Sequence, residues 1–184
     1  DLSKKEKHYH EKNQVRDLAM MQLMLGTGIR VSECVGLNCS DVDFQNNAIR
    51  IHRKGGKEVS IYFSDEVEQG LRAYMEERKS KIPAAGHENA LFLSLQNKRM
   101  SVRTVELMVK KYAQKVTPLK HITPHKLRSS YGTNLYQETG DIYLVADVLG
   151  HSDVNTTKKH YAALEEERRR SVRNLVRLRK EEGE

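Results

Sequence analysis

Residues 123–161, TPHKLRSSYGTNLYQETGDIYLVADVLGHSDVNTTKKHY, carry the strongest structural and chemical signals of the chain. Thr123 followed by Pro124 predicts a helix start, because a threonine hydroxyl accepts a first-turn N–H and proline fits the first helical position. His125 and Arg128 then project from one face of the first turn, where the helix dipole favours an anion. This face predicts a phosphate-binding site.

Two glycines and an aspartate divide the rest of this stretch into further elements. Gly140 predicts the end of the first helix, and Asp141 predicts the N-cap of a second helix that ends at Gly150. The apolar residues of the second helix predict a buried side made of Ile142, Leu144, Val145, Val148 and Leu149.

A histidine and a tyrosine follow at element ends, where functional side chains are often held. His151 comes directly after the second helix, Ser152 or Asp153 can cap a short third helix, and Tyr161 follows. Taken alone, each has an ordinary explanation, such as a surface histidine or a half-buried tyrosine. The joint spacing of these residues favours a phosphoryl-transfer site instead.

The composition indicates one domain, with or without a tail, and an anionic partner. The chain has 184 residues, with 32 basic and 25 acidic side chains and a formal net charge of +7. Cys34 and Cys39 are too few for a disulfide framework, which favours a reduced, cytoplasmic protein. No apolar run approaches the length of a membrane span, and no signal peptide opens the chain.

An arginine follows a constrained turn in residues 26–33, GTGIRVSE. Two glycines force the turn, and Arg30 then enters a predicted helix over residues 31–37. The rigid fork of a guanidinium suits bidentate binding of phosphate. The alternative is a structural ion pair with Glu33 or Asp41.

Residues 41–63, DVDFQNNAIRIHRKGGKEVSIYF, predict a three-stranded antiparallel meander. Asn46-Asn47 and Gly55-Gly56 supply the positive φ angles that tight turns need. Lys54 lies at the second turn, with Lys57 just beyond it. A lysine at a hairpin tip can donate a proton in a neighbouring groove, although most such lysines are merely solvated.

Apolar periodicity and capping residues predict further helices over residues 13–26, 64–81, 101–116 and 163–180. The helix after Ser101 is expected to bury Val102, Val105, Met108, Val109, Tyr112 and Val116, and to direct Arg103, Lys110 and Lys111 outward. That outward face can meet a DNA backbone or remain solvated.

Together these motifs resemble the catalytic domain of a tyrosine recombinase, of the phage-integrase and Xer family. GTGIRVSE is similar to the first arginine box of the family, and RKGGK (53–57) to its β-hairpin lysine box. HKLR (125–128) through LGHSDVNTTKKHY (149–161) is similar to the second box, which ends in the nucleophile. The resemblance covers nearly the whole chain.

The resemblance implies a mainly α fold with a small three-stranded antiparallel sheet (α+β). It implies that Tyr161 is the nucleophile and that Arg30 and Arg128 clamp the scissile phosphate of double-stranded DNA. The expected reaction breaks and rejoins strands through a 3′-phosphotyrosyl intermediate, with no metal, ATP or other cofactor.

The resemblance also implies hydrogen bonding and proton handling by His125 and His151, and protonation of the leaving 5′ oxygen by Lys54. Lys57 takes that role if the hairpin register is shifted. Two positions depart from the commonest family pattern. Ser129 replaces a histidine found in many members, and the interval from His151 to Tyr161 is one residue longer than in the Xer pattern.

We expect a catalytic domain over residues 1–163 and a C-terminal amphipathic helix over residues 164–184. The apolar stripe of this helix, Val172, Leu175 and Val176, is expected to dock in cis or in trans. The resemblance implies a tetramer on DNA and a monomer for an isolated fragment. It also implies an N-terminal DNA-clamping domain that this polypeptide does not contain.

Two other functions remain compatible with the sequence. A type IB topoisomerase uses similar residues without choosing a target site. A non-catalytic helical DNA-binding module would use Arg30 and Arg128 only to bind phosphate. The target sequence, and the choice among integration, excision and dimer resolution, cannot be deduced from these residues.

Overall fold

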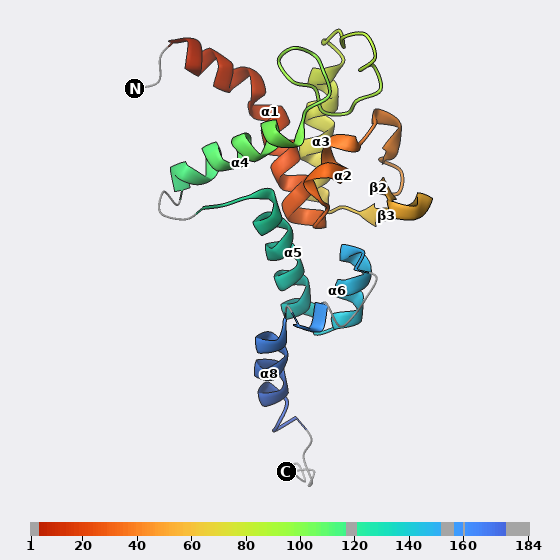
Figure 1. Ribbon diagram of the computed structural model, residues 1–184, viewed down its shortest axis with the longest axis vertical. Helices are drawn as coiled ribbons and strands as arrows, with labels where there is room; N and C mark the ends of the chain where they lie inside the picture. Colours follow the sequence, from red (N-terminus) through yellow and green to blue (C-terminus); the bar gives the residue numbers. More distant parts are fainter. Residues whose placement is uncertain (1–3, 117–120, 152–156, 160, 176–184) are drawn as a thin grey trace, which may run out of the picture. The chain divides into compact units, whose positions relative to one another are not determined.

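A computed structural model describes residues 4–116, 121–151, 157–159 and 161–175 (Figure 1). Contacts within the chain divide it into two compact units, residues 1–131 and 132–184. The helices and strands that lie entirely within the first unit are α1 (Lys4–Thr27), α2 (Val31–Gly36), η1 (Cys39–Asp41), β1 (Val42–Asp43), β2 (Ala48–Arg53), η2 (Lys54–Gly56), β3 (Lys57–Tyr62), α3 (Asp65–Arg78) and α4 (Val102–Val116). α5 (Pro124–Thr139) begins in the first unit, and α6 (Ile142–Leu149) and α8 (Ala162–Ser171) lie in the second.

The predicted meander is present as a three-stranded antiparallel sheet in the order β1-β2-β3. Its register places Ile49 opposite Ile61. Asn47 and Gly55 have φ angles of 51° and 81°, so the turns use the positive φ values that the sequence predicts. The lysine hairpin therefore extends from a regular two-stranded base.

The core of the first unit is aliphatic, with a few aromatic and sulfur-containing side chains. α1 packs along α3, and the inner face of the sheet contributes to the same core. Its fully buried large side chains include Met20, Leu23, Met24, Ile49, Ile51, Leu71, Tyr74 and Phe92. Cys34 also lies in this core, and burial raises the pKa of its thiol to about 12, which agrees with a packing role.

Three helix predictions need correction. α1 begins at Lys4 rather than Asn13, because the preceding lysines and glutamates are good helix formers and extend the helix. α3 ends at Arg78, and residues up to Lys81 continue only as turns. Val116 was predicted to be buried but is exposed, because it is the last residue of α4 and lies beyond the packed face.

The capping predictions around α5 and α6 are confirmed. The Thr123 hydroxyl accepts from the Lys126 N–H at 3.3 Å, and α5 starts at Pro124. Asp141 accepts from two N–H groups at the start of α6, and Gly150 ends that helix with φ 73°.

The predicted buried side of α6 is correct for Ile142, Val145 and Leu149. Leu144 is exposed, contrary to prediction, because it is only two residues from Ile142 and faces away from the stripe spaced by three and four residues. Ala146 completes that stripe instead.

The C-terminal helix is shorter than predicted. α8 ends at Ser171, and the residues that follow, up to Leu175, form turns. Val172 and Leu175 are exposed, while Val176 and the capping candidates Ser152 and Asp153 lie outside the described residues. The predicted domain boundary at residue 163 therefore stays a prediction. No helix in the described part of the chain has both the length and the apolar character needed to cross a membrane.

Candidate active site

Arg128 lies buried in the first unit against the turn that precedes Arg30. α5 carries Arg128 in its second turn, and the Arg128 Nη1 donates a hydrogen bond to the carbonyl of Gly28 at 2.5 Å. Gly28 has φ 70°, a conformation that glycine adopts without strain, and it is two residues before Arg30. The structure thus brings the second predicted arginine to the segment that presents the first.

Arg30 is held at the N-cap of α2 by Glu33. The Arg30 backbone N–H donates to Glu33 Oε1 at 2.8 Å, and Arg30 Nη1 lies 3.5 Å from Oε2. The Glu33 side chain is 6% exposed and also accepts from Arg53 Nε at 3.1 Å. The Arg30 side chain is 43% exposed, so it keeps access to solvent despite this ion pair.

The same carboxylate ties α2 to the lysine hairpin. Arg53 is the last residue of β2, and Lys54 follows at the start of η2. The Lys54 side chain lies outside the described part of the structure. Lys57 pairs with Arg53 in the strand register and is exposed. The choice between Lys54 and Lys57 therefore stays open.

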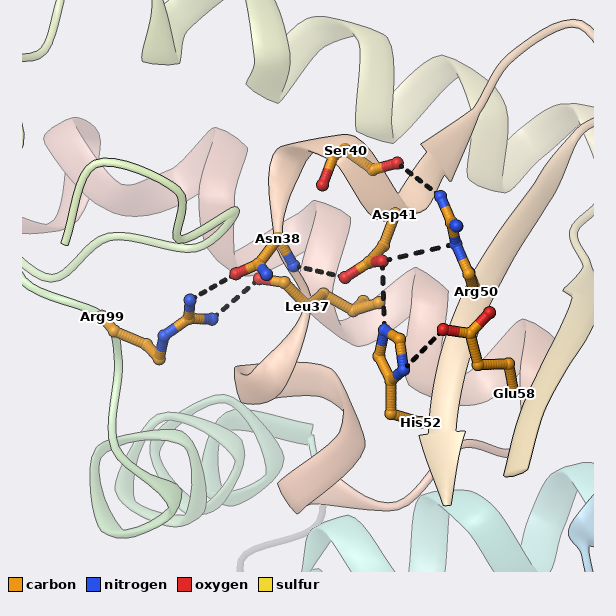
Figure 2. A network of polar contacts seen from close by, with 8 residues as sticks. All are labelled: Leu37, Asn38, Ser40, Asp41, Arg50, His52, Glu58 and Arg99. Atoms are coloured by element: carbon orange, nitrogen blue, oxygen red, sulfur yellow. Dashed lines mark hydrogen bonds and ion pairs between the residues drawn. The ribbon is translucent and has the colours of Figure 1, made fainter. Parts of the chain in front are cut away.

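A polar network supports the base of this hairpin (Figure 2). The buried Asp41 carboxylate lies 3.4 Å from His52 Nε2 and 3.6 Å from Arg50 Nε. It also accepts a hydrogen bond from the Asn38 N–H. The other ring nitrogen of His52 lies 3.3 Å from Glu58, its partner across the strands. These contacts fix η1 to β2, and thereby the strand that leads to Lys54.

His125 is exposed at the start of α5 and borders a cavity of about 390 Å³ within the first unit. The cavity is lined by α4, by Val31 at the start of α2 and by residues 121–125. Its polar lining includes Arg103, Lys110, His121, His125 and Glu106, and Glu106 lies 3.6 Å from Arg103, so the cations outnumber the one carboxylate. This lining suits a polyanion that lies across α4 and the start of α5.

In the second unit, Thr157 joins the predicted histidine to the predicted tyrosine. His151 Nδ1 and the Thr157 hydroxyl are 2.5 Å apart, and the N–H of His151 donates to the Ala146 carbonyl at the end of α6. The Tyr161 N–H donates to the Thr157 carbonyl at 3.1 Å, which is one helical turn. His151 and Tyr161 are therefore held by one fully buried residue.

The Tyr161 ring is itself buried, with 3% of the residue exposed. It stacks on Tyr136 of α5, with ring centroids 6.1 Å apart and an interplanar angle of 18°. Tyr161 is also the N-cap residue of α8, which begins at Ala162. The phenol is thus an ordered part of the second unit.

The predicted residues fall into two sets. Arg30, His125 and Arg128 belong to the first unit, with the backbone of Lys54, whereas His151 and Tyr161 belong to the second unit. Sequence reasoning considered Glu33 only as a structural partner of Arg30, and it missed Thr157, Tyr136 and Gly132. The three-residue spacing of Arg30 and Glu33, which lets the glutamate accept from the N–H of the N-cap residue, was available as a signal. Gly132 and Tyr136 are distant in sequence from their partner Tyr161, and Thr157 follows another threonine, so we find no usable signal for these three.

Comparison with known proteins places this architecture in a family. The model of the phage integrase family matches residues 3–168, so the chain belongs to that family. The predicted recognition as a tyrosine recombinase catalytic domain is confirmed, as is the mainly helical fold with a small antiparallel sheet.

Two curated relatives illustrate the similarity. The tyrosine recombinase XerC of Actinobacillus pleuropneumoniae serotype 7 (strain AP76) is 36% identical over 149 residues, which is 81% of this chain and 48% of the relative. The tyrosine recombinase XerS of Streptococcus agalactiae serotype III (strain NEM316) is 34% identical over 177 residues, 95% of this chain and 49% of the relative. The chain therefore spans about half the length of these relatives.

Two solved structures resemble the chain. The crystal structure of XerA recombinase has a TM-score of 0.75 and 29% identity, and the match covers 92% of this chain and 64% of XerA. The Tn1549 transposon integrase, solved in complex with circular intermediate DNA, has a TM-score of 0.63 and 26% identity, with 83% of this chain and 54% of the integrase covered.

Proposed function

We propose that this chain is the catalytic part of a site-specific DNA recombinase that breaks and rejoins strands through a 3′-phosphotyrosyl intermediate. The observation that carries the proposal is the hydrogen bond from Arg128 to Gly28, because it brings one arginine to the turn that presents Arg30. Two guanidiniums from segments a hundred residues apart would thereby serve one phosphate. Family membership supports the same chemistry.

Arg30 and Arg128 would bind the non-bridging oxygens of the scissile phosphate. Negative charge on these oxygens must be balanced as the transition state forms, and guanidiniums do this with a bidentate geometry. The cation pair performs the task that a metal ion performs in other phosphoryl-transfer enzymes, so the proposal requires none. His125 and His151 would donate hydrogen bonds to the same phosphate and handle protons.

Tyr161 would act as the nucleophile. The phenolic proton passes to one of the two histidines as the phenolic oxygen forms a bond to phosphorus. The bond from phosphorus to the 5′ oxygen breaks, and Lys54 supplies the proton that this leaving oxygen takes. The DNA is left with a 3′-phosphotyrosyl end and a free 5′ hydroxyl. Attack by a 5′ hydroxyl of a second strand reverses these steps, so one phosphodiester replaces another without ATP.

Double-stranded DNA is the proposed substrate. Arg103, Lys110 and Lys111 are exposed along α4, next to the cavity that His125 borders. Cationic side chains in such an arrangement attract phosphates and release counterions on binding. The structure of the Tn1549 integrase is a complex with DNA, which supports the same partner here.

Covalent trapping tests the proposal. The full chain is incubated with a pool of duplexes that contain a nick and flanking randomised positions, so that a cleaved strand end diffuses away and the adduct accumulates. Adducts are separated under denaturing conditions and their DNA is sequenced. We expect wild-type adducts that share a sequence, no adducts with Tyr161→Phe, and wild-type behaviour with the exposed-tyrosine control Tyr62→Phe.

Each other outcome has a defined meaning. Adducts that persist in Tyr161→Phe overturn the assignment of the nucleophile. Adducts with no shared sequence, together with relaxation of supercoiled plasmid, indicate a type IB topoisomerase instead. Salt-dependent DNA binding without any adduct indicates a non-catalytic binding module.

We further propose that the active form is a homo-oligomer, a tetramer on DNA, in which the segment after Ser171 docks on a neighbouring copy. The exposed apolar side chains Val172 and Leu175 support this. A cytoplasmic location, expected from the cysteine usage, stays a prediction.

A further inference from the structure

Three residues of the second unit surround the Tyr161 ring, and we call them the Tyr161 seat: Gly132, Tyr136 and Leu149. Gly132 and Tyr136 are four residues apart in α5, so they lie on one face in consecutive turns. Tyr136 stacks on the Tyr161 ring, and Leu149 approaches from the end of α6. All three are buried, so the seat is closed around the phenol.

Gly132 is the part of the seat that admits the hydroxyl. A Cβ at position 132 would overlap the Tyr161 Oη, would lie 3.3 Å from Tyr161 Cζ and would lie 3.1 Å from Leu149 Cδ1. Any other residue at this position would therefore require the phenol to move. Glycine weakens a helix interior relative to alanine, so close approach of the phenol is the physical reason for its presence.

Tyr136 supplies the flat face of the seat. Burial raises the pKa of Tyr136, which keeps it a neutral partner for the Tyr161 ring at ordinary pH. Aromatic pairs in such stacked arrangements stabilise one ring position over others beyond the effect of area burial alone. The ring of Tyr136 thus favours a single position of Tyr161.

We infer that Gly132 and Tyr136 are positioning residues that hold Tyr161 in a buried resting position, from which the phenol must move before it attacks DNA. This inference rests on the proposed function only in taking Tyr161 as the nucleophile. The phenolic oxygen lies against Gly132 of α5, at a point that the Leu149 side chain also approaches, and only 3% of Tyr161 is exposed. A phosphate cannot reach an oxygen enclosed in this way, so the strength of the seat limits cleavage.

Fluorine NMR on the full chain measures the seat without any DNA. The chain contains eight tyrosines, and labelling with 3-fluorotyrosine gives each a resonance, of which the Tyr161→Phe variant identifies one. Relaxation caused by a soluble gadolinium chelate reports the exposure of each ring. In the wild type we expect the Tyr161 resonance to be protected relative to that of Tyr62, which is 70% exposed.

Gly132→Ala should shift the Tyr161 resonance and raise its gadolinium relaxation towards that of Tyr62. Gly36→Ala is the matched control, because a Cβ at Gly36, also in a helix, meets nothing within 4 Å. Tyr136→Phe keeps the ring and should behave as wild type, whereas Tyr136→Leu removes the ring and should expose Tyr161. If the Tyr161 resonance stays unchanged and protected in both Gly132→Ala and Tyr136→Leu, these two residues do not hold Tyr161 in its buried position.

Single-turnover trapping on saturating nicked DNA then tests the resting position. If the seat must open before attack, Gly132→Ala and Tyr136→Leu should raise the first-order rate of adduct formation roughly two- to tenfold, the range that a lost aromatic stack implies. The dissociation constant for DNA should not change. If variants that expose Tyr161 form adducts at the wild-type rate or more slowly, Tyr161 does not have to leave a buried resting position before it attacks DNA.

Failure of the proposed function is distinguishable from failure of this inference. Wild-type adducts that survive Tyr161→Phe refute Tyr161 as the nucleophile, while the fluorine measurement still decides whether the seat exists. If Gly132→Ala does not fold, Tyr136→Leu provides both readouts, since it only removes side-chain atoms.

Discussion

Arg30 has a structural role at the start of α2 and a proposed role in binding phosphate. It caps α2 through Glu33 and still keeps 43% of its side chain exposed, so its guanidinium can exchange a carboxylate for a phosphate without a change of backbone. Arg128 is buried instead, and its hydrogen bond to Gly28 fixes its direction. The two arginines therefore differ in how far substitution should affect folding.

Arg30→Ala should abolish chemistry and leave the fold intact. Because an arginine at a phosphoryl-transfer site supports on the order of 10³-fold or more in rate, we expect adduct formation to fall at least that far. The free energy of unfolding should change by less than about 1 kcal/mol, since the ion pair that is lost is partly exposed. Single-turnover trapping and urea unfolding measure the two effects.

The control for Arg30→Ala is Arg72→Ala, which removes a surface arginine that is paired with Glu68. It should trap DNA at the wild-type rate. If Arg30→Ala traps DNA as fast as Arg72→Ala does, Arg30 does not contact the scissile phosphate.

Tyr74 should make stability depend on pH in the alkaline range. Its hydroxyl donates to the Leu91 carbonyl and accepts from the Leu93 N–H, and burial raises its pKa to about 12. The neutral phenol is thus favoured in the folded state, and its contribution is complete below pH 10 and lost as the pH rises towards 12. A shift of this size corresponds to roughly 2 to 3 kcal/mol.

Urea unfolding between pH 8 and pH 12, for wild type and Tyr74→Phe, checks this dependence. The variant loses two hydrogen bonds, so it should be less stable at pH 8 by about 1 to 2 kcal/mol. Its stability should fall less steeply than that of the wild type above pH 10. Parallel curves for the two proteins would contradict the assignment.

At the scale of elements, Glu33 joins α2 to the end of β2. Its carboxylate accepts a hydrogen bond from the Arg30 N–H and forms ion pairs with the guanidiniums of Arg30 and Arg53. The network around Asp41 (Figure 2) contacts the same strand, which leads to Lys54. Glu33 therefore fixes both the base of the hairpin and Arg30.

Glu33→Gln should slow chemistry more than it alters DNA binding. The amide can still accept from the Arg30 N–H, but it no longer balances two guanidiniums in a site that is 6% exposed. We expect adduct formation to fall about tenfold or more, with an unfolding free energy lower by about 1 to 3 kcal/mol.

Glu76→Gln, which changes an exposed carboxylate, is the control for Glu33→Gln. The ratio of trapping rate to DNA affinity distinguishes loss of positioning from loss of binding. Equal rates in the two variants would show that Glu33 positions neither arginine.

Local signals were sufficient to predict most elements. Thr123-Pro124 predicted the start of α5, Asp141 the start of α6, and Gly55 a hairpin turn with positive φ. Each of these depends on a backbone group within a few residues. Helix length was less predictable, since α1 extends to Lys4 and α8 ends at Ser171, where competing propensities are similar.

Contacts between distant segments could not be predicted from one sequence. The stacking of Tyr136 on Tyr161 depends on how α5 meets the residues that precede α8, and no local pattern encodes it. The bond between His151 and Thr157 is short in sequence, yet threonine next to threonine gives no indication of which hydroxyl is used. The family resemblance pointed to Tyr161 and His151, whereas the residues that contact them, Tyr136 and Thr157, could be identified only from the structure.

At the scale of the whole molecule, residues 172–175, which follow α8, form turns and are exposed. Val172 and Leu175 are exposed, although both are apolar. Such side chains are commonly covered when a protein assembles. This exposure agrees with the proposed docking of the segment on a neighbouring copy.

Deletion of residues 172–184 should leave the unfolding free energy within about 0.5 kcal/mol of the wild-type value, because Val172 and Leu175 are exposed and exposed side chains contribute little to it. Assembly on DNA should weaken, as measured by sedimentation of the protein–DNA complex. A deletion variant that unfolds much more easily would show instead that the segment docks on its own chain. Replacement of Val172 and Leu175 by serine keeps the length and should weaken assembly in the same way.

Thr157 determines where this chain can tolerate a change of length. Its hydroxyl contacts His151 and its carbonyl accepts from Tyr161 across four residues, a separation fixed by the geometry of one turn. An inserted residue between positions 157 and 161 would break that turn and rotate the phenol away. The four-residue separation of Thr157 and Tyr161 is therefore a length that an engineered variant must keep if the phenol is to keep its place.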